Sequence, residues 1–292
     1  MKWKGRRAST NVKDYRGRRS GSSSGAGLLG LLFQFGSRLG IKGMIAAVII
    51  GGVLWKMGLV DPMQLLGGAP QESSGPVQAS AQEQEQMEFI KVILADNEDI
   101  WRAEFARHSA QYEDPQLIVF RNSVRTGCGA ASAASGPFYC PSDRSIYIDL
   151  GFYDQLEQSF DAPGDFAQAY VIAHEVGHHI QTLVGTSQEV NAMRGQANYN
   201  EYSVRLELQA DFYAGVWANH SQQYLERGDI EEALRAANAI GDDAIQQKAQ
   251  GKVIPHTFTH GTSEQRMRWF YKGLRSGRIE DGDTFSMPYS EL

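Results

Sequence analysis

The sequence predicts an α+β domain in which helices dominate and the sheet is small. Apolar residues recur at helical spacing in two long segments, 166–184 and 199–220. Two short runs rich in β-branched and aromatic residues, 117–120 and 145–150, precede them and are predicted to be strands. A turn signal, Pro163-Gly164-Asp165, separates the strands from the helices. Short strands followed by long helices are typical of the α+β class.

The other predicted elements complete one domain over residues 88–292. Residues 89–108 are predicted to form a helix, because their apolar positions share one broad face. The acidic run at 229–232 (DIEE) indicates the start of another helix. Residues 61–87 are rich in Gly, Pro, Ser and Gln and lack the apolar content to bury a core, so they are predicted to be a linker.

The first 42 residues are strongly basic. They contain ten Lys or Arg and one acid, Asp14, so they carry +9 in a chain of net charge −6, and the rest of the chain carries −15. The basic residues are Lys2, Lys4, Arg6, Arg7, Lys13, Arg16, Arg18, Arg19, Arg38 and Lys42. A basic head of this kind can bind a nucleic-acid backbone, but its position directly before an apolar segment favours membrane topology as its cause, so no nucleic-acid partner is expected. Basic residues before an apolar segment are typical of the cytoplasmic side of a membrane protein.

Residues 43–60 (GMIAAVIIGGVLWKMGLV) form that apolar segment, with one charge at Lys56. A membrane-spanning helix needs about 20 apolar residues, with a lower limit of about 17. Lys56 can extend toward the interface, and Trp55 suits the headgroup region. The segment is predicted to be an uncleaved single-pass anchor, with residues 1–42 as a cytoplasmic tail and the body outside the cytoplasm. A cleaved signal peptide is the alternative.

The two cysteines agree with a body outside the cytoplasm. Cys128 and Cys140 enclose a segment rich in Gly, Ala and Ser. A disulfide across such a loop stabilises a fold by about 3 kcal/mol, and it persists in the periplasm or outside the cell. A cysteine-based metal site is the alternative, but the close pairing that such sites use is lacking.

The central motif, HEVGH, runs from His174 to His178 within the helix predicted over 166–184. Residues i and i+4 of a helix share a face, so both imidazoles can bind one zinc ion. Glu175 is rotated by about 100° from His174, which places it beside the metal rather than on it. It is therefore predicted to be the general base for a zinc-activated water. His179 points away from this face and is not expected to be a ligand.

The helix predicted over 199–220 offers a third ligand. Glu207 and Asp211 are also i and i+4, so their carboxylates face the same way. Two acids in an otherwise apolar stretch need a compensating cation or hydrogen bond when they are buried. We assign Glu207 to the metal and Asp211 to the other ring N–H of His174, where it would fix the tautomer. Glu201 or Asp211 as the metal ligand remains an alternative.

At these motifs the chain resembles a known family. The segments IAHEVGHHIQ, ELQADFYAG and THGTSEQRMRWF resemble the putative neutral zinc metallopeptidases of bacterial membranes. The GCG…GPFYCP and YIDLGFYDQL segments do so too, and the resemblance covers essentially the whole chain. The Glu-x-x-x-Asp pattern is more distantly similar to gluzincins, including the CAAX-prenyl-protease class. The resemblance implies a zincin-like fold with two metal-bearing helices beside a small sheet, in a protein of the bacterial inner membrane with a periplasmic domain.

A third block, Thr259 to Arg266, resembles the Thr-His…Arg segment that follows the ligand helix in those membrane proteases. His260 is a candidate donor to the oxygen that gains negative charge during attack on a peptide carbonyl. Arg266 is a candidate partner of a ligand carboxylate or of the substrate backbone. The alternative is structural: Thr262 or Ser263 would cap a helix, and Arg266 would form a surface ion pair.

These residues predict a zinc peptidase, with one zinc ion per chain, that hydrolyses protein or peptide substrates outside the cytoplasm. The strand predicted over 145–150 precedes the motif helix, and zincins often bind an extended peptide along an edge strand. The alternative function is a catalytically silent, zinc-stabilised binding or scaffold domain at the membrane. The intact Glu175 argues against it, because a structural zinc site needs no base.

Overall fold

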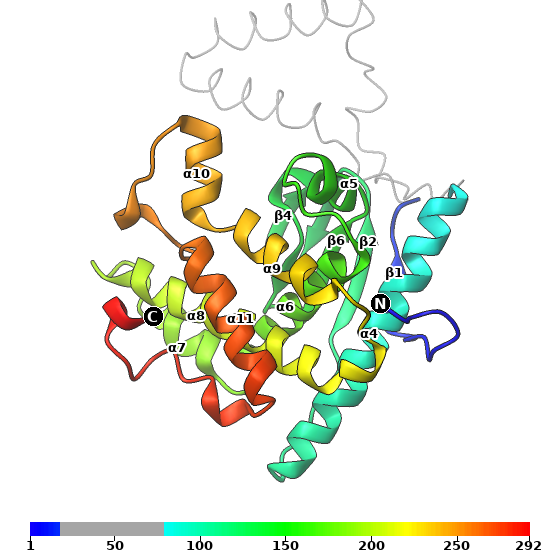
Figure 1. Ribbon diagram of the computed structural model, residues 1–292, viewed down its shortest axis with the longest axis horizontal. Helices are drawn as coiled ribbons and strands as arrows, with labels where there is room; N and C mark the ends of the chain where they lie inside the picture. Colours follow the sequence, from blue (N-terminus) through cyan, green and yellow to red (C-terminus); the bar gives the residue numbers. More distant parts are fainter. Residues whose placement is uncertain (18–78) are drawn as a thin grey trace, which may run out of the picture. The chain divides into compact units, whose positions relative to one another are not determined.

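The computed structural model describes residues 1–17 and 79–292. The predicted helix-rich α+β class is confirmed within them (Figure 1). The helices are α4 (Ala81–Arg107), α5 (Gly151–Gln158), α6 (Asp165–Leu183), α7 (Thr186–Ala192), α8 (Tyr199–His220), α9 (Asp229–Ala239), α10 (Asp242–Gln250) and α11 (Ser263–Ser276). The strands are β1 (Val12–Asp14), β2 (Gln116–Phe120), β3 (Ser123–Thr126), β4 (Gly129–Ser132), β5 (Phe138–Cys140) and β6 (Ser145–Asp149). The helices predicted over 166–184 and 199–220 are α6 and α8.

The main sheet has four strands in the order β1-β2-β6-β5. β1, β2 and β6 are parallel, and β5 is antiparallel to β6. β2 and β6 are buried along almost their whole length, as expected for inner strands of a parallel sheet. The core joins this sheet to α4, α6 and α8, and Figure 1 shows α11 lying alongside α8.

α4 begins directly after Ser80, inside the segment predicted to be a linker. The Ser80 hydroxyl accepts a hydrogen bond from the Glu83 N–H at 3.1 Å, and the Glu83 carboxylate accepts one from the Ser80 N–H at 2.9 Å. This reciprocal pair is a capping box, which satisfies two free donors at a helix start. The linker predicted over 61–87 is therefore wrong from Ser80 onward, and residues 61–78 lie outside the described residues.

The start of the chain is part of this domain. Met1–Arg16 belongs to the same compact unit as Val77–Leu292, and β1 pairs with β2. The N-terminal ammonium of Met1 lies 2.8 Å from a carboxylate oxygen of Asp165, the first residue of α6. The prediction of a separate tail over residues 1–42 is therefore wrong for residues 1–16.

Four of the six basic residues within residues 1–16 pair with acids of the same unit. Arg6 binds Asp96, and Nη2 of Arg7 lies 2.9 Å from a carboxylate oxygen of the buried Glu98. Two further pairs are Lys4 with Glu85 and Arg16 with Asp14. These charges stabilise the fold through their ion pairs. They therefore give no indication of a cytoplasmic location, although their number in the sequence predicted one.

The pairing of β1 with β2 also restricts membrane topology. Hydrogen-bonded strands lie on one side of a bilayer, whereas a single crossing at 43–60 would put residues 1–16 and 79–292 on opposite sides. The predicted single-pass topology with a cytoplasmic N-terminus does not fit this pairing. The apolar segment 43–60 itself lies outside the described residues. Among the helices of the described ranges, none is long and apolar enough to cross a membrane.

The predicted disulfide between Cys128 and Cys140 is confirmed, with their Cα atoms 5.8 Å apart. Cys140 is fully buried, whereas Cys128 is exposed. The bond ties the short hairpin of β3 and β4 to the end of β5, and thus to the outer strand of the main sheet.

Candidate metal centre

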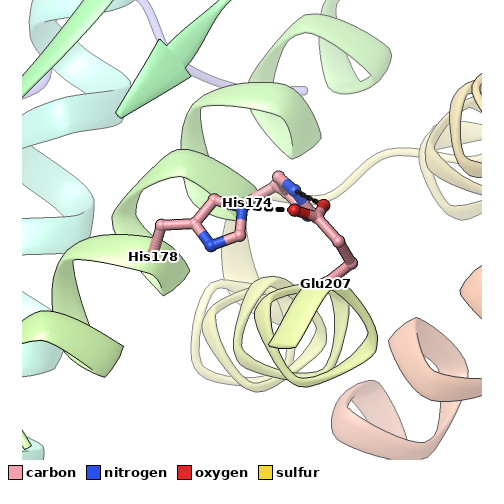
Figure 2. A group of neighbouring side chains, drawn as sticks. All are labelled: His174, His178 and Glu207. Atoms are coloured by element: carbon pink, nitrogen blue, oxygen red, sulfur yellow. Dashed lines mark ion pairs between the residues drawn. The ribbon is translucent and has the colours of Figure 1, made fainter. Parts of the chain in front are cut away.

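Two neighbouring helices bring His174, His178 and Glu207 together. The imidazoles come from successive turns of α6 and the carboxylate comes from α8, and Figure 2 shows the three side chains pointing toward one another. Nε2 of His174 lies 3.2 Å from one carboxylate oxygen of Glu207. Nε2 of His178 lies 3.4 Å from the other oxygen. The ligand atoms of all three residues are within 4.8 Å of one another.

These donors fit a zinc ion. Nitrogen and oxygen ligands sit about 2.0–2.2 Å from zinc in a tetrahedral site, so two ligand atoms on one ion are about 3.3–3.5 Å apart. The two nitrogen–oxygen distances, 3.2 and 3.4 Å, are close to this separation. Two imidazoles and one carboxylate are also a donor set of catalytic zinc sites, which keep a fourth position open. Within the described residues, this cluster offers three such ligands.

Gly177 lets the two helices that carry the candidate ligands approach closely. A Cβ atom at this position would lie 2.9 Å from both the Cα and the carbonyl oxygen of Ala210 on α8. Backbone atoms cannot give way as a flexible side chain does, so any larger residue would push the helices apart. Gly177 precedes His178, and Ala210 lies between Glu207 and Asp211. The contact therefore sets the spacing at the level of the ligands.

A second close contact joins α8 to α11. Cβ atoms at Gly215 of α8 and Gly273 of α11 would each lie 2.0 Å from a carbonyl oxygen of the facing helix. One turn before Gly215, α8 carries Asp211, and two turns before Gly273, α11 carries Arg266. The glycines thus allow a backbone contact that brings this carboxylate and this guanidinium together.

Asp211 orients His174. Its Oδ1 atom lies 2.8 Å from Nδ1 of His174 and accepts a hydrogen bond from the Tyr170 hydroxyl at 2.5 Å. Nε of Arg266 donates to Oδ2 at 2.8 Å. Burial opposes ionisation of Asp211, but the charges of Arg266 and His174 outweigh it and lower the pKa of Asp211 to about 2. A charged Asp211 accepts a hydrogen bond from the protonated Nδ1 of His174, which leaves Nε2 for the metal.

Gln181 supports His178 in the same way, and the sequence interpretation missed it. Its side-chain oxygen lies 2.9 Å from Nδ1 of His178. Its amide donates to the carbonyl oxygen of Leu206 at 2.6 Å. Gln181 is fully buried and ties the second imidazole to the residue before Glu207. The sequence contained a signal for this contact: Gln181 is three residues after His178, and residues i and i+3 of a helix are neighbours.

Glu175 is buried beside the imidazole pair, with an exposed fraction of 7%. Burial raises its pKa above the ordinary glutamate value, although the charges of His178 and His174 oppose this. A carboxylate with a raised pKa is a stronger base and is suited to proton transfer. Glu175 is not among the three residues whose ligand atoms lie together, in keeping with its rotation on the helix.

His260 lies on the turn that precedes α11, and half of its side chain is exposed. Its Nδ1 atom lies 3.2 Å from a carboxylate oxygen of Asp242. The hydrogen bond to Asp242 and the charge of Glu207 raise the pKa of His260. Arg266 faces Asp211 and is buried, so the surface ion pair that was its alternative role is wrong.

The structure separates the other candidate residues from the ligand cluster. Glu201 is exposed in the first turn of α8, outside the cluster. Asp211 faces Nδ1 of His174 rather than the metal-facing nitrogen. His179 has one ring nitrogen 3.0 Å from the Tyr139 hydroxyl and the other 2.6 Å from the carbonyl oxygen of Glu113, so both its nitrogens have partners in the core.

The strand predicted over 145–150 is not an edge strand. It forms β6, which pairs with β2 on one side and β5 on the other. Its buried run reflects this inner position, because both faces are covered. Among the strands of the described residues, β5 ends the sheet on the side where it packs against α6.

Comparison with known proteins gives one family and several relatives. The family model described as "Putative neutral zinc metallopeptidase" matches residues 1–285. Uncharacterized protein YpfJ of Escherichia coli (strain K12) is 46% identical over 293 residues, which cover 98% of this chain and 99% of the relative. Uncharacterized protein Rv2575 of Mycobacterium tuberculosis is 44% identical over 188 residues, which cover 60% of this chain and 64% of the relative. No solved structure matches the chain.

Proposed function

The chain belongs to the putative neutral zinc metallopeptidase family, and on this premise we propose that it hydrolyses peptide bonds of protein or peptide substrates. One zinc ion is held by His174, His178 and Glu207. Glu175 is the general base. The proposed fold is zincin-like, with the two ligand-bearing helices packed beside a small sheet.

The observation that carries this proposal is the combination of three ligands with a separate buried carboxylate. A structural zinc site is closed by four protein ligands, whereas a catalytic site has three and keeps one position open. A structural site also has no use for Glu175, whose burial raises the pKa of its carboxyl group. The scaffold alternative explains neither feature.

The roles of the residues follow from their positions. Zinc, when bound, supplies Lewis-acid chemistry that polarises a carbonyl and makes water a better nucleophile. Glu175 accepts a proton from the attacking water and passes it to the departing amine. Asp211 and Gln181 hold the two imidazoles in the required tautomer. His260 donates to the carbonyl oxygen as it gains charge.

The outer edge of β5 is the proposed place for the substrate backbone. An extended peptide that adds to a sheet edge gains affinity from main-chain hydrogen bonds and specificity from alternate side chains. β5 packs against α6, the helix that carries both histidines, and it ends at the disulfide-bonded Cys140. This replaces the inner strand β6, which has no free edge.

The proposed location is the outside of the cytoplasm, in the bacterial periplasm, with residues 43–60 as membrane attachment. The disulfide supports an oxidising compartment. Residues 1–16 and 79–292 are then on the same side, as the pairing of β1 with β2 requires.

The decisive experiment compares wild type with Glu175→Gln, with Glu157→Gln on an exposed face of α5 as the matched control. The full-length protein is incubated with a library of fluorescence-quenched peptides, and its zinc content is measured. We expect Glu175→Gln to retain zinc and lose hydrolysis, and Glu157→Gln to match wild type. Hydrolysis that survives Glu175→Gln, or a wild type that binds zinc and cleaves nothing, would support the scaffold function instead.

A further inference from the structure

The turn formed by residues 259–261 is packed onto α8 beside the ligand Glu207. Gly261 has a φ of +89°, which few residues other than glycine adopt. A Cβ atom at Gly261 would lie 3.2 Å from Val204 and 3.4 Å from Leu208. These side chains come from one turn before Glu207 and from the residue after it. The turn therefore lies at the level of the candidate metal centre.

A single carboxylate holds this turn. Oδ2 of Asp242, the first residue of α10, accepts hydrogen bonds from the backbone N–H groups of Thr259 at 2.7 Å and His260 at 2.6 Å. It also accepts that of Gly261 at 3.1 Å. In return, the N–H of Asp242 donates to the carbonyl oxygen of Gly261 at 2.9 Å. The backbone on both sides of His260 is thus fixed relative to α10.

The second oxygen of Asp242 holds the imidazole itself. Oδ1 lies 3.2 Å from Nδ1 of His260, and the hydroxyl oxygen of Thr259, in the same turn, lies 3.1 Å from that nitrogen. With Nδ1 engaged, Nε2 is the ring nitrogen left to interact with a substrate, and half of the side chain is open to solvent. Within the described residues, Asp242 forms no ion pair with a Lys or Arg, although it is largely buried. A buried carboxylate needs partners, and here every recorded partner belongs to the turn that carries His260.

We propose that Asp242 is a positioning residue of the peptidase: it presents Nε2 of His260 to the carbonyl oxygen of the scissile peptide bond. This inference rests on the proposed function. Asp242, which is 18 positions away from His260 in the sequence, would orient the imidazole of His260 as Asp211 orients that of His174. A preorganised donor is effective only if it is already aimed at the place where charge develops, because no energy is then spent on reorienting it.

The test is a double-mutant cycle in the full-length protein. Asp242→Asn keeps an oxygen for the backbone N–H groups but removes the carboxylate from Nδ1 of His260. His260→Ala removes the donor, and the third variant combines both changes. Asp154→Asn on the exposed face of α5 is the control. Each is assayed for zinc content and for kcat and KM on a fluorescence-quenched peptide that wild type cleaves.

We expect His260→Ala to lower kcat about 100-fold and Asp242→Asn about 10-fold to 100-fold, with similar KM and zinc content. The double variant should be no slower than His260→Ala, because Asp242 has nothing left to position. If the two losses multiply instead, Asp242 does not act through His260. An unchanged kcat in Asp242→Asn would also overturn the inference.

A second readout does not need activity. In protein with ¹⁵N-labelled histidine, the Nδ1 signal of His260 should show a proton hydrogen-bonded to a carboxylate. Asp242→Asn should shift this signal and Asp154→Asn should not. If the signal is the same in wild type and Asp242→Asn, the ring is not held and the inference fails. A wild type that cleaves no peptide would refute the proposed function, whatever this signal shows.

Discussion

Arg266 and Asp211 form a buried ion pair in which Nε of the guanidinium lies 2.8 Å from Oδ2 of the carboxylate. A second contact, from Nη2 to Oδ1, is 3.0 Å long. The exposed fractions of the two residues are 2% and 0%. Because Asp211 also faces His174, the pair links α11 to a candidate zinc ligand through one carboxylate.

We expect Arg266→Ala to destabilise the zinc-free protein by about 3–5 kcal/mol, because it leaves the Asp211 carboxylate buried without its cation. Arg268→Ala, two residues on and exposed, should have little effect. Urea unfolding followed by circular dichroism measures both. Equal midpoints for Arg266→Ala and Arg268→Ala would show that the buried pair contributes no net stability.

Gln181→Leu should weaken zinc binding about 10-fold to 100-fold, which is typical when the partner of a metal-bound histidine is removed. The change keeps the side-chain volume but removes the acceptor for Nδ1 of His178. Competition with a coloured chelator measures the affinity, with Gln155→Leu on the exposed face of α5 as the control. The same chelator curve for both variants would contradict a role for Gln181 in holding His178.

The sequence was sufficient to predict the cluster of candidate ligands because helical spacing is local. His174 and His178, like Glu207 and Asp211, are four residues apart, and any helix places such pairs on one face. The fold class followed from the same periodicity. Asp242 could not be found in this way, because its partner His260 is 18 residues distant and joined to it through a turn between helices.

The N-terminal segment was misjudged for a related reason. The partners of Arg6 and Arg7, namely Asp96 and Glu98, are about 90 residues away in the sequence. When tertiary contacts are unknown, a cluster of cationic residues with no acidic residues close by in the sequence is interpreted as a solvated tail. The short strand β1 has too few residues to give a periodic signal, so its pairing with β2 was invisible as well.

The shared fold predicts that both ends of the segment 17–78 are on one side of the membrane. Lys4→Cys and Arg227→Cys each place a single thiol on an exposed position, since the two native cysteines are bonded to each other. In intact cells with a permeabilised outer membrane, a charged maleimide that cannot cross the inner membrane should label both variants equally. Labelling of Arg227→Cys without Lys4→Cys would restore the single-pass topology.

The pKa of Asp211 predicts how the zinc-free protein responds to acid. Arg266 and His174 outweigh burial and hold this pKa at about 2, below its ordinary value of about 3.9. A carboxyl group whose pKa is lower in the folded state contributes stability above its unfolded pKa and loses it as the pH falls through the folded one. For Asp211 this contribution is about 2–3 kcal/mol, present above pH ~4 and lost progressively toward pH ~2.

Asp211→Asn cannot titrate, so its stability deficit relative to wild type should be largest near neutral pH. The deficit should shrink by most of that amount between pH ~5 and pH ~2, because only wild type loses the charge. Urea unfolding of zinc-free protein at a series of pH values measures it, with Asp154→Asn on exposed α5 as the control. A deficit that stays constant over this range would mean that the carboxyl group of Asp211 is not held in its charged form by Arg266 and His174.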